Sequence, residues 1–238
     1  MFDVFRISFL EYKKFFCKKS VYICLGLFFI FFLMSVDQLT KSNVSVNPVY
    51  LINMIFNGFM QFVLMFCASS LLPEEFRCGT STFIFTSTKS RTQILLTKIL
   101  FFTLYSITIG LMNFILITYY MTTKNLPIPF NNFAYMLVFY FIYSWFIGNY
   151  FLFFTVIFKS RAISFITGLF FLYFFSDCLL RLSQKMLVST KILEFIPFYS
   201  VFQFLIGDSI NANKIIGMLI GALIFFCLSA FIFEKQDL

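Results

Sequence analysis

Six long runs of this 238-residue chain carry no charged side chain. A charge at the centre of a lipid bilayer costs about 2.5–3.5 kcal/mol on insertion scales, so charge-free apolar runs of about 20 residues are candidate membrane spans. We therefore expect an all-α polytopic membrane protein with six transmembrane helices. Their approximate ranges are 20–36, 49–72, 94–121, 132–158, 162–180 and 214–233, with Lys98, Asp177 and Lys214 near the ends of three of them.

Composition supports a chain that lies mostly in lipid. Hydrophobic residues make up 61% of the sequence and charged residues 12%, against roughly 45–50% and about 25% in soluble domains. The net charge of +8 would suggest nucleic-acid binding in a soluble protein. In a membrane protein the position of the cations matters more than their sum. We predict a single transmembrane domain over 1–238, with the lipid bilayer and not nucleic acid as its surroundings.

The Lys and Arg residues are distributed unequally between alternate sides of the predicted spans. Twelve lie in the N-terminal segment, the second and fourth loops and the tail, whereas the short loops on the other side carry only Lys41 and Lys124. By the positive-inside rule both termini face the cytoplasm. Four further cations in the last outer loop weaken this asymmetry without reversing it.

The sequence offers no recognisable catalytic or metal site. It contains no His, and the Ser-His and Glu-His forms of hydrolytic chemistry need an imidazole. Asp177 is the only acidic residue within a predicted span, and no GxxxxGK[ST] phosphate loop occurs. The six Cys residues form no CxxC pair. We expect neither enzymatic activity nor a cofactor or metal bound by this chain.

Residues 1–19 form an amphipathic pattern before the first span. Five aromatic residues recur at helical spacing, with Arg6, Lys13 and Lys14 mostly on the other side. We predict an interfacial helix on the inner leaflet, with a generic basic anchor and a specific docking role both open. The five aromatic residues are Phe2, Phe5, Phe9, Tyr12 and Phe16.

Polar side chains recur inside the predicted spans. Asn53, Asn57 and Gln61 are four residues apart in the second span, so they lie on one helix face. Amides in lipid need partners, which predicts that this face meets other helices or a translocation path. Helix-to-helix hydrogen bonding explains any one of them without a path. Gly217 and Gly221 form a GxxxG pair in the sixth span, a pattern typical of close packing.

Residues 194–210 include a charge-free run of 13 residues, too short to cross a bilayer. Runs of about 10–14 apolar residues are typical of re-entrant or interfacial segments. Pro197 would interrupt a straight helix at this point. We predict an outer re-entrant segment, with re-entrant helices before the last span.

The cytoplasmic loop 73–93 is the most informative stretch of the chain. Pro73 followed by Glu74 and Glu75 favours the start of a helix, because proline suits the first turn and carboxylates stabilise the positive end of the helix dipole. Arg91 and Lys98 place cations near the return into the membrane. We predict a short helix in this loop.

This loop resembles that of ABC transporter permeases of type 2. The resemblance lies in Glu75, the Gly79-Thr80 pair, the Ser90-Arg91 pair and Lys98. Over the rest of the chain it extends to the amphipathic start, the six spans, the short apolar segment before the sixth span, and the tail that begins at Phe233.

The resemblance implies the pore subunit of an ATP-driven exporter. Two permease copies, identical or related, would work with two separate cytoplasmic ABC ATPase subunits, and ATP and magnesium would bind to the ATPase. The loop helix would be a coupling helix seated in a groove of the ATPase, whereas a solvated loop is the alternative. The coupling residues would be Glu74, Glu75, Phe76, Arg77, Gly79, Thr80, Phe83 and Arg91.

The resemblance also suggests a path and a class of cargo. In the family the second and fifth spans line the path, which makes Asn53, Asn57, Gln61, Thr167 and Tyr173 the path candidates. A narrow polar stripe among Phe and Met favours an amphipathic or hydrophobic cargo.

Small Phe-rich permeases of this kind resemble bacterial exporters of antimicrobial or cytolytic peptides, including lantibiotic immunity and phenol-soluble-modulin exporters. We therefore expect peptide export across a bacterial plasma membrane, with export and self-immunity both open as the role. Export of lipid, polysaccharide or drugs, and a non-transport scaffold that recruits a cytoplasmic partner, are the alternatives.

Overall fold

The computed structural model describes residues 2–17, 26, 29, 30, 34, 48–73, 91–123, 131–184, 189–205 and 211–235. The regular structure in these residues is helical, which confirms the all-α prediction for them. The helices are α1 (Phe2–Phe16), α3 (Pro48–Leu71), α6 (Arg91–Thr123), α7 (Asn131–Phe158), α8 (Arg161–Gln184), α9 (Thr190–Leu193), α10 (Pro197–Leu205) and α11 (Ala212–Lys235).

Five of these helices, α3, α6, α7, α8 and α11, are long and apolar enough to cross a membrane. They coincide with the last five predicted spans. Several run past the predicted ends, as α8 does beyond residue 180 to Gln184, because charged side chains such as Arg181 near a helix end can reach the interface. The predicted span 20–36 lies outside the described residues apart from four isolated positions, so the sixth span stays a prediction.

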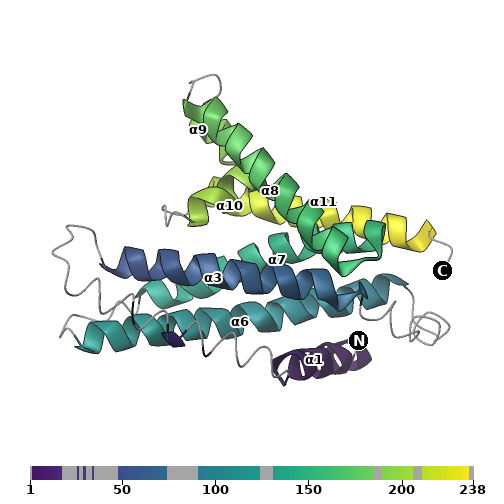
Figure 1. The fold of residues 1–238 in the computed structure, drawn as a ribbon, viewed down its shortest axis with the longest axis horizontal. Coiled ribbons are helices and arrows are strands. Elements are labelled where there is room, and N and C mark those ends of the chain that lie inside the picture. The colour runs from purple at the N-terminus through teal and green to yellow at the C-terminus, as the bar shows by residue number, and fades with distance from the viewer. Residues whose placement is uncertain are drawn as a thin grey trace.

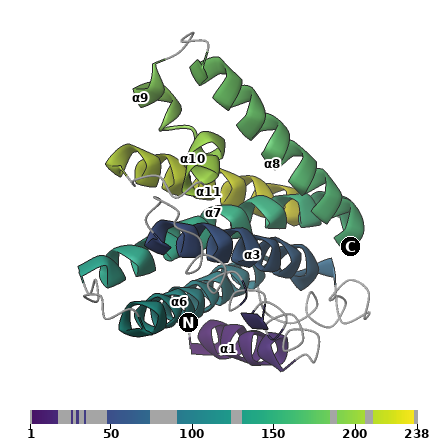
Figure 2. The same cartoon turned by 60° about the vertical axis from the view of Figure 1, so that its left-hand side comes forward.

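The central helix of the bundle is α7. In its membrane-crossing stretch 72% of the residues are buried, against 28% in α11 and 22% in α8. Its sequence is apolar on every side, as expected for a helix surrounded by others. Figures 1 and 2 show α3, α6 and α7 running alongside one another, while α8 diverges from the bundle towards α9.

Glycines in α6 and α7 allow these helices to approach closely. A Cβ added at Gly148 would overlap the ring of Phe102, and one at Gly110 would overlap the side chain of Leu137. The two pairs also fix the relative direction of the helices. Along α6 the order is Phe102 and then Gly110, whereas along α7 their partners come in the reverse order, Gly148 after Leu137. Helices α6 and α7 are therefore antiparallel, as expected for consecutive spans joined by a short connection.

The chain termini meet the beginning of α6 at one end of the bundle. Glu11 of α1 pairs with Lys98, and Arg91 binds the last carbonyls of α11. The link from α7 to α8 is at this same end and contains Lys159 in the left-handed region, at φ 50. We call it the α1 end; α9 lies away from it, as Figure 1 shows, and α10 reaches the middle of the bundle, where Phe198 packs against Phe146 of α7 and Phe225 of α11.

Helix α1 presents a different face to α6 than its aromatic pattern predicts. Phe15 is buried, whereas Phe5 and Phe9 point outwards with 57% and 51% exposure. Tyr12 and Phe16 pack partly against the core. The predicted stripe is therefore split between two environments, because the face that meets α6 is the neighbouring one that carries Ser8, Glu11 and Phe15.

The segment 194–210, predicted to lie on the outer side, begins with a break between two short helices. Helix α9 ends at Leu193, and α10 begins with Pro197 at its first position, where proline is favoured. A Cβ on Gly217 would overlap the backbone of Phe195, and one on Gly221 would meet the Pro197 ring. The GxxxG pair of α11 thus packs against this segment within the same chain. Its re-entrant character stays a prediction.

Candidate functional site

Most of the predicted coupling residues lie outside the described part of the chain. The residues affected are Glu74, Glu75, Phe76, Arg77, Gly79, Thr80 and Phe83. The structure does describe the two residues that border them. Pro73 is buried after the end of α3, and Arg91 begins α6. The coupling role of the loop therefore stays a prediction, and its exit at Arg91 has a described geometry.

Arg91 makes an intramolecular contact that the sequence analysis missed. Its Nη1 donates hydrogen bonds to the backbone oxygens of Phe233, at 2.7 Å, and Glu234, at 3.1 Å. Thr92 Oγ1 donates to Glu234 Oε1 at 2.7 Å. The last carbonyls of a helix lack partners within the helix and form the negative end of its dipole, so a guanidinium stabilises them. We call these four residues the Arg91 clasp.

No pattern in the sequence could have revealed the clasp, because 142 residues separate Arg91 from Phe233. The clasp now connects the exit of the predicted coupling loop directly to the end of the last membrane-crossing helix.

A buried ion pair joins α1 to α6 one to two turns further along α6. Lys98 Nζ lies 2.6 Å from Glu11 Oε1, with side-chain exposures of 1% and 20%. Ser8 Oγ donates to the backbone oxygen of Thr97 at 2.8 Å. A charge as deeply buried as that of Lys98 needs a partner, since its desolvation is costly. The sequence singled out Lys98 but gave no reason to pair it with Glu11.

The path candidate Asn57 belongs to a polar cluster at the centre of three helices. Tyr140 of α7 donates a hydrogen bond to Asn57 Oδ1, and Asn113 Nδ2 of α6 donates to the Tyr140 hydroxyl at 2.7 Å. Asn57 and Asn113 are buried. This contact is helix-to-helix hydrogen bonding, the alternative that the sequence left open. Asn113 was missed, although the rule that buried amides need partners applies to it equally.

Gln61, one turn after Asn57, is also buried but is not fully partnered. Its exposure is 2%, and Nε2 has no hydrogen-bond partner among the described residues. Asn53 lies one turn before Asn57 on the same helix. Whether this row lines a path in the assembled transporter stays a prediction.

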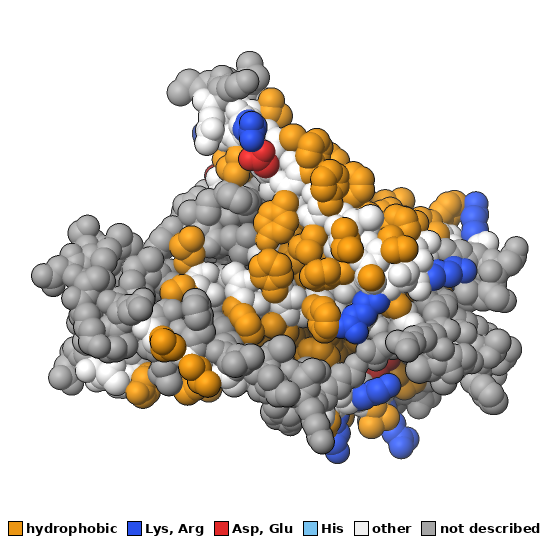
Figure 3. Space-filling model, in the orientation of Figure 1, with side chains coloured by type: hydrophobic (Ala, Val, Ile, Leu, Met, Phe, Trp, Pro, Cys, Tyr) orange, Lys and Arg blue, Asp and Glu red, His pale blue; other side chains and the backbone are white. Residues whose placement is uncertain are grey.

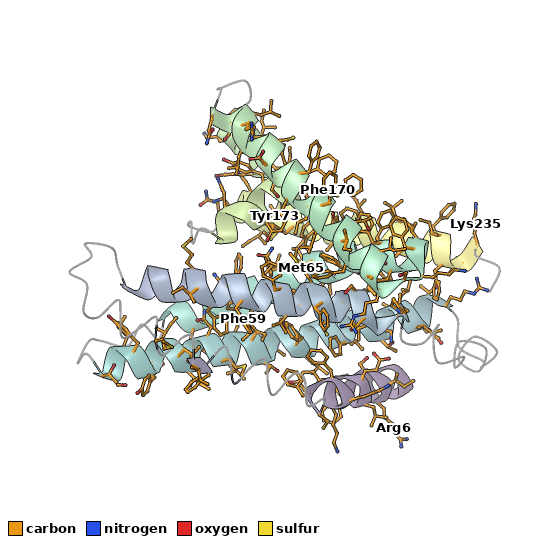
Figure 4. All side chains as sticks on the ribbon, in the orientation of Figure 1. Arg6, Phe59, Met65, Phe170, Tyr173 and Lys235 are labelled. Carbon is orange, nitrogen blue, oxygen red and sulfur yellow. The ribbon has the colours of Figure 1, made fainter. Side chains whose placement is uncertain are left out.

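The two path candidates on α8 have different surroundings from those on α3. Thr167 Oγ1 donates to the backbone oxygen of Ile163 on its own helix at 2.6 Å. Tyr173 is 40% exposed, and Figure 4 shows it on α8 together with Phe170. The structure therefore does not gather all the path candidates at one point: Asn57 and Gln61 are inside the bundle, whereas Tyr173 is at its surface.

An exposed apolar face extends over α8 and the neighbouring side of α3. Figure 3 shows hydrophobic side chains gathered over this region. We call this set the aromatic face, and its exposed members are Phe62, Phe66, Ile163, Ile166, Phe170 and Phe174. Their exposure was not predictable from the sequence, because an apolar residue in a membrane span is the expected case.

Cations gather at the α1 end of the bundle. Arg6, Lys13, Lys14 and Lys235 are exposed there, and Figure 4 shows Arg6 pointing away from the bundle. Arg161 lies over the ring of Phe66, with 3.8 Å from its Cζ to the ring centroid, an arrangement that favours cation–π attraction. In the described part of the chain no group of three or more His, Cys, Asp or Glu residues is placed to hold a metal ion.

The chain matches a known protein family. A family model described as "ABC-2 family transporter protein" matches residues 33–233. The matched region includes α3, α6, α7, α8, α9 and α10 in full and all but the end of α11. It therefore covers the polar cluster, the aromatic face and the α6 side of the clasp. Among curated proteins none matches the chain.

Proposed function

Because the chain belongs to the ABC-2 family of transporter proteins, we propose that it exports amphipathic or hydrophobic peptides with a second permease copy. Family membership makes it a multi-pass membrane protein and a permease subunit that works with an ATPase partner. The chain itself is not an enzyme. ATP and magnesium belong to the ATPase, and the permease supplies the path.

The aromatic face is the observation that supports this class of cargo. Phe170 and Phe174 are 62% and 51% exposed and one turn apart on α8, so a cargo can contact both. Burying a Phe side chain completely contributes about 1.5–3 kcal/mol, and aromatic anchors dominate many binding interfaces. The hydroxyl of Tyr173 on the same helix offers a hydrogen bond to a peptide group.

The composition of this face disfavours strongly polar cargo. Between Arg161 and Asp177, α8 carries no charged side chain, and most of its residues are not buried. Ions and sugars need oxygen or charged ligands in exchange for their hydration. A peptide with one apolar side fits the exposed rings better, because its polar side can remain towards water or towards the amides of α3.

Transport by purified components tests the cargo class. The permease and its ATPase are reconstituted in inside-out vesicles with a fluorescent amphipathic helical peptide or a neutral oligosaccharide. We expect ATP-dependent uptake of the peptide only. The double variant Phe170→Ala/Phe174→Ala should reduce peptide uptake by about fivefold or more, because each ring contributes apolar contact area.

A matched control uses a second exposed apolar pair. Ile220 and Ile224 of α11 are 50% and 52% exposed and also one turn apart. Replacing both by Ala should change uptake by less than about twofold if α11 only faces lipid. Uptake of the oligosaccharide but not the peptide, or equal losses in both double variants, would refute the proposed cargo path.

The predicted coupling loop has its own test. Glu75→Lys or Gly79→Trp should remove the stimulation of ATP hydrolysis and weaken co-purification of the ATPase, since a reversed charge or a large ring would disturb a docked helix. Full retention of both properties would show that docking uses another surface.

A further inference from the structure

The first eight residues of α6 hold both terminal helices of the chain. Arg91 and Thr92 bind the last turn of α11, and Thr97 and Lys98 bind α1. These contacts come directly after the predicted coupling loop. A displacement of the loop exit must therefore move these helices with it or break the bonds.

Helix α11 connects the clasp to the opposite end of the bundle. It is a continuous helix of 24 residues, about 36 Å long at 1.5 Å per residue. Near its beginning, Gly217 lies so close to the backbone of Phe195 that even a methyl group would not fit. Further along, the Phe225 ring packs edge-on against Tyr150 and Phe198. The helix is thus held by the clasp at its last turn and by the outer segment at its first turns.

The chemistry of Arg91 suits a firm connection. One guanidinium nitrogen donates to two consecutive backbone oxygens, and the positive charge of the group strengthens both bonds. Backbone oxygens cannot rotate away as a side chain can. The clasp therefore follows the position of the α11 backbone.

We propose that Arg91 is a positioning residue that transmits movement of the 74–90 loop through α11 to the outer segment, with the clasp closed throughout the cycle. The inference rests on the proposed docking of an ATPase on this loop. It assigns Arg91 a contact within the permease and not, as the resemblance implies, a contact with the ATPase.

Hydrogen exchange of the intact permease–ATPase complex provides a readout that needs no identified cargo. The quantity measured is the exchange rate of residues 190–205 with and without ATP and vanadate. In the unmodified complex we expect a change of about threefold or more, and in Arg91→Ala less than about 1.5-fold, with the ATPase still bound and hydrolysing ATP. Arg91→Lys should be intermediate, because an ammonium keeps the positive charge but stands on a shorter side chain.

A neighbouring cation serves as the control. Lys235 is exposed and lies over the Phe231 ring, 4.1 Å from Nζ to the centroid. Lys235→Ala removes one positive charge at the same helix end without removing a clasp bond, so the nucleotide response should be retained.

A chemical bridge separates transmission from loss of fold. In a background with its cysteines replaced by Ser, Thr92→Cys and Glu234→Cys are joined by a short bismaleimide in the Arg91→Ala protein. We expect the bridge to restore the response, and the same bridge in the presence of Arg91 to leave it intact. Failure to restore the response, or arrest of the Arg91 protein by the bridge, would overturn the inference.

The outcomes distinguish the two proposals. If the unmodified complex retains no ATPase, the proposed function fails. If the ATPase is bound but residues 190–205 show no nucleotide response, or if Arg91→Ala responds equally, only the clasp inference fails. If the Arg91→Ala permease no longer binds the ATPase, and the chemical bridge does not restore this binding, Arg91 contacts the ATPase directly and the inference is wrong.

Discussion

The attachment of α1 to α6 depends on the buried pair between Glu11 and Lys98. The Lys98 side chain is 1% exposed and that of Glu11 is 20% exposed, with 2.6 Å between Nζ and Oε1. Glu11→Gln keeps the shape and an accepting oxygen but removes the negative charge. The buried ammonium of Lys98 then loses the carboxylate of Glu11.

The expected cost follows from this burial. Hydrogen bonds to charged groups contribute about 1.5–3 kcal/mol, and breaking a fully buried pair costs about 3–5 kcal/mol. We expect the lower range, because Glu11 is partly exposed and a lysine side chain can extend towards water. A loss of about 1.5–3 kcal/mol in the free energy of opening corresponds to about 10- to 150-fold faster local exchange.

Hydrogen exchange of the α1 amides measures this opening directly. Lys13→Gln is the matched control, since Lys13 is an exposed cation on the same helix, and it should change exchange by less than about twofold. Amides in the middle of α7 should not respond to either variant.

A change of less than about threefold in Glu11→Gln would refute the reasoning, because it would mean that the ion pair contributes no more than an exposed one. The double variant Glu11→Leu/Lys98→Met provides a further check. It should be less destabilised than the sum of the two single changes, since no charge remains buried without a partner.

Two further predictions concern packing and hydrogen bonds in the bundle. Gly148→Ala should destabilise the protein by about 1–3 kcal/mol because the new methyl group overlaps a ring of α6. The control Gly58→Ala, at a position with open space around it, should stabilise the protein by up to about 1 kcal/mol. Thermal unfolding in detergent compares the two variants, and equal shifts of the unfolding temperature would contradict the close approach of α6 and α7. Tyr140→Phe removes the hydroxyl at the centre of the polar cluster and should cost about 0.6–1.7 kcal/mol. Tyr119→Phe, at an exposed side chain, should leave the unfolding temperature unchanged. If Tyr119→Phe lowered it as much as Tyr140→Phe, the polar cluster would not be the cause.

The spans were predictable because their signal is local. A charge in lipid is costly wherever the rest of the chain lies, so the distance between charged residues alone predicted the five described membrane-crossing helices. Their ends were less predictable. The structure continues α8 beyond Asp177 and Arg181, which pair with each other at the helix surface with 2.8 Å between Nε and Oδ2.

Helix orientation was only partly predictable. The spacing of Asn57 and Gln61 indicated a face that needs partners, and the structure buries both side chains. The aromatic pattern of residues 1–19 indicated a helix but not the side that meets α6. That side is set by Ser8, Glu11 and Phe15, whose partners are about 90 residues away.

By itself the sequence determined that the chain is a helical membrane protein, where five of its spans lie, and which family it resembles. These properties follow from the free energy of each segment in lipid, which depends on that segment's own residues. Only the tertiary structure decided that Arg91 holds the end of α11, that Lys98 pairs with Glu11, and that Tyr140 joins Asn57 to Asn113. Each of these contacts joins residues that are distant in sequence, and the reason they meet is the packing of whole helices around α7.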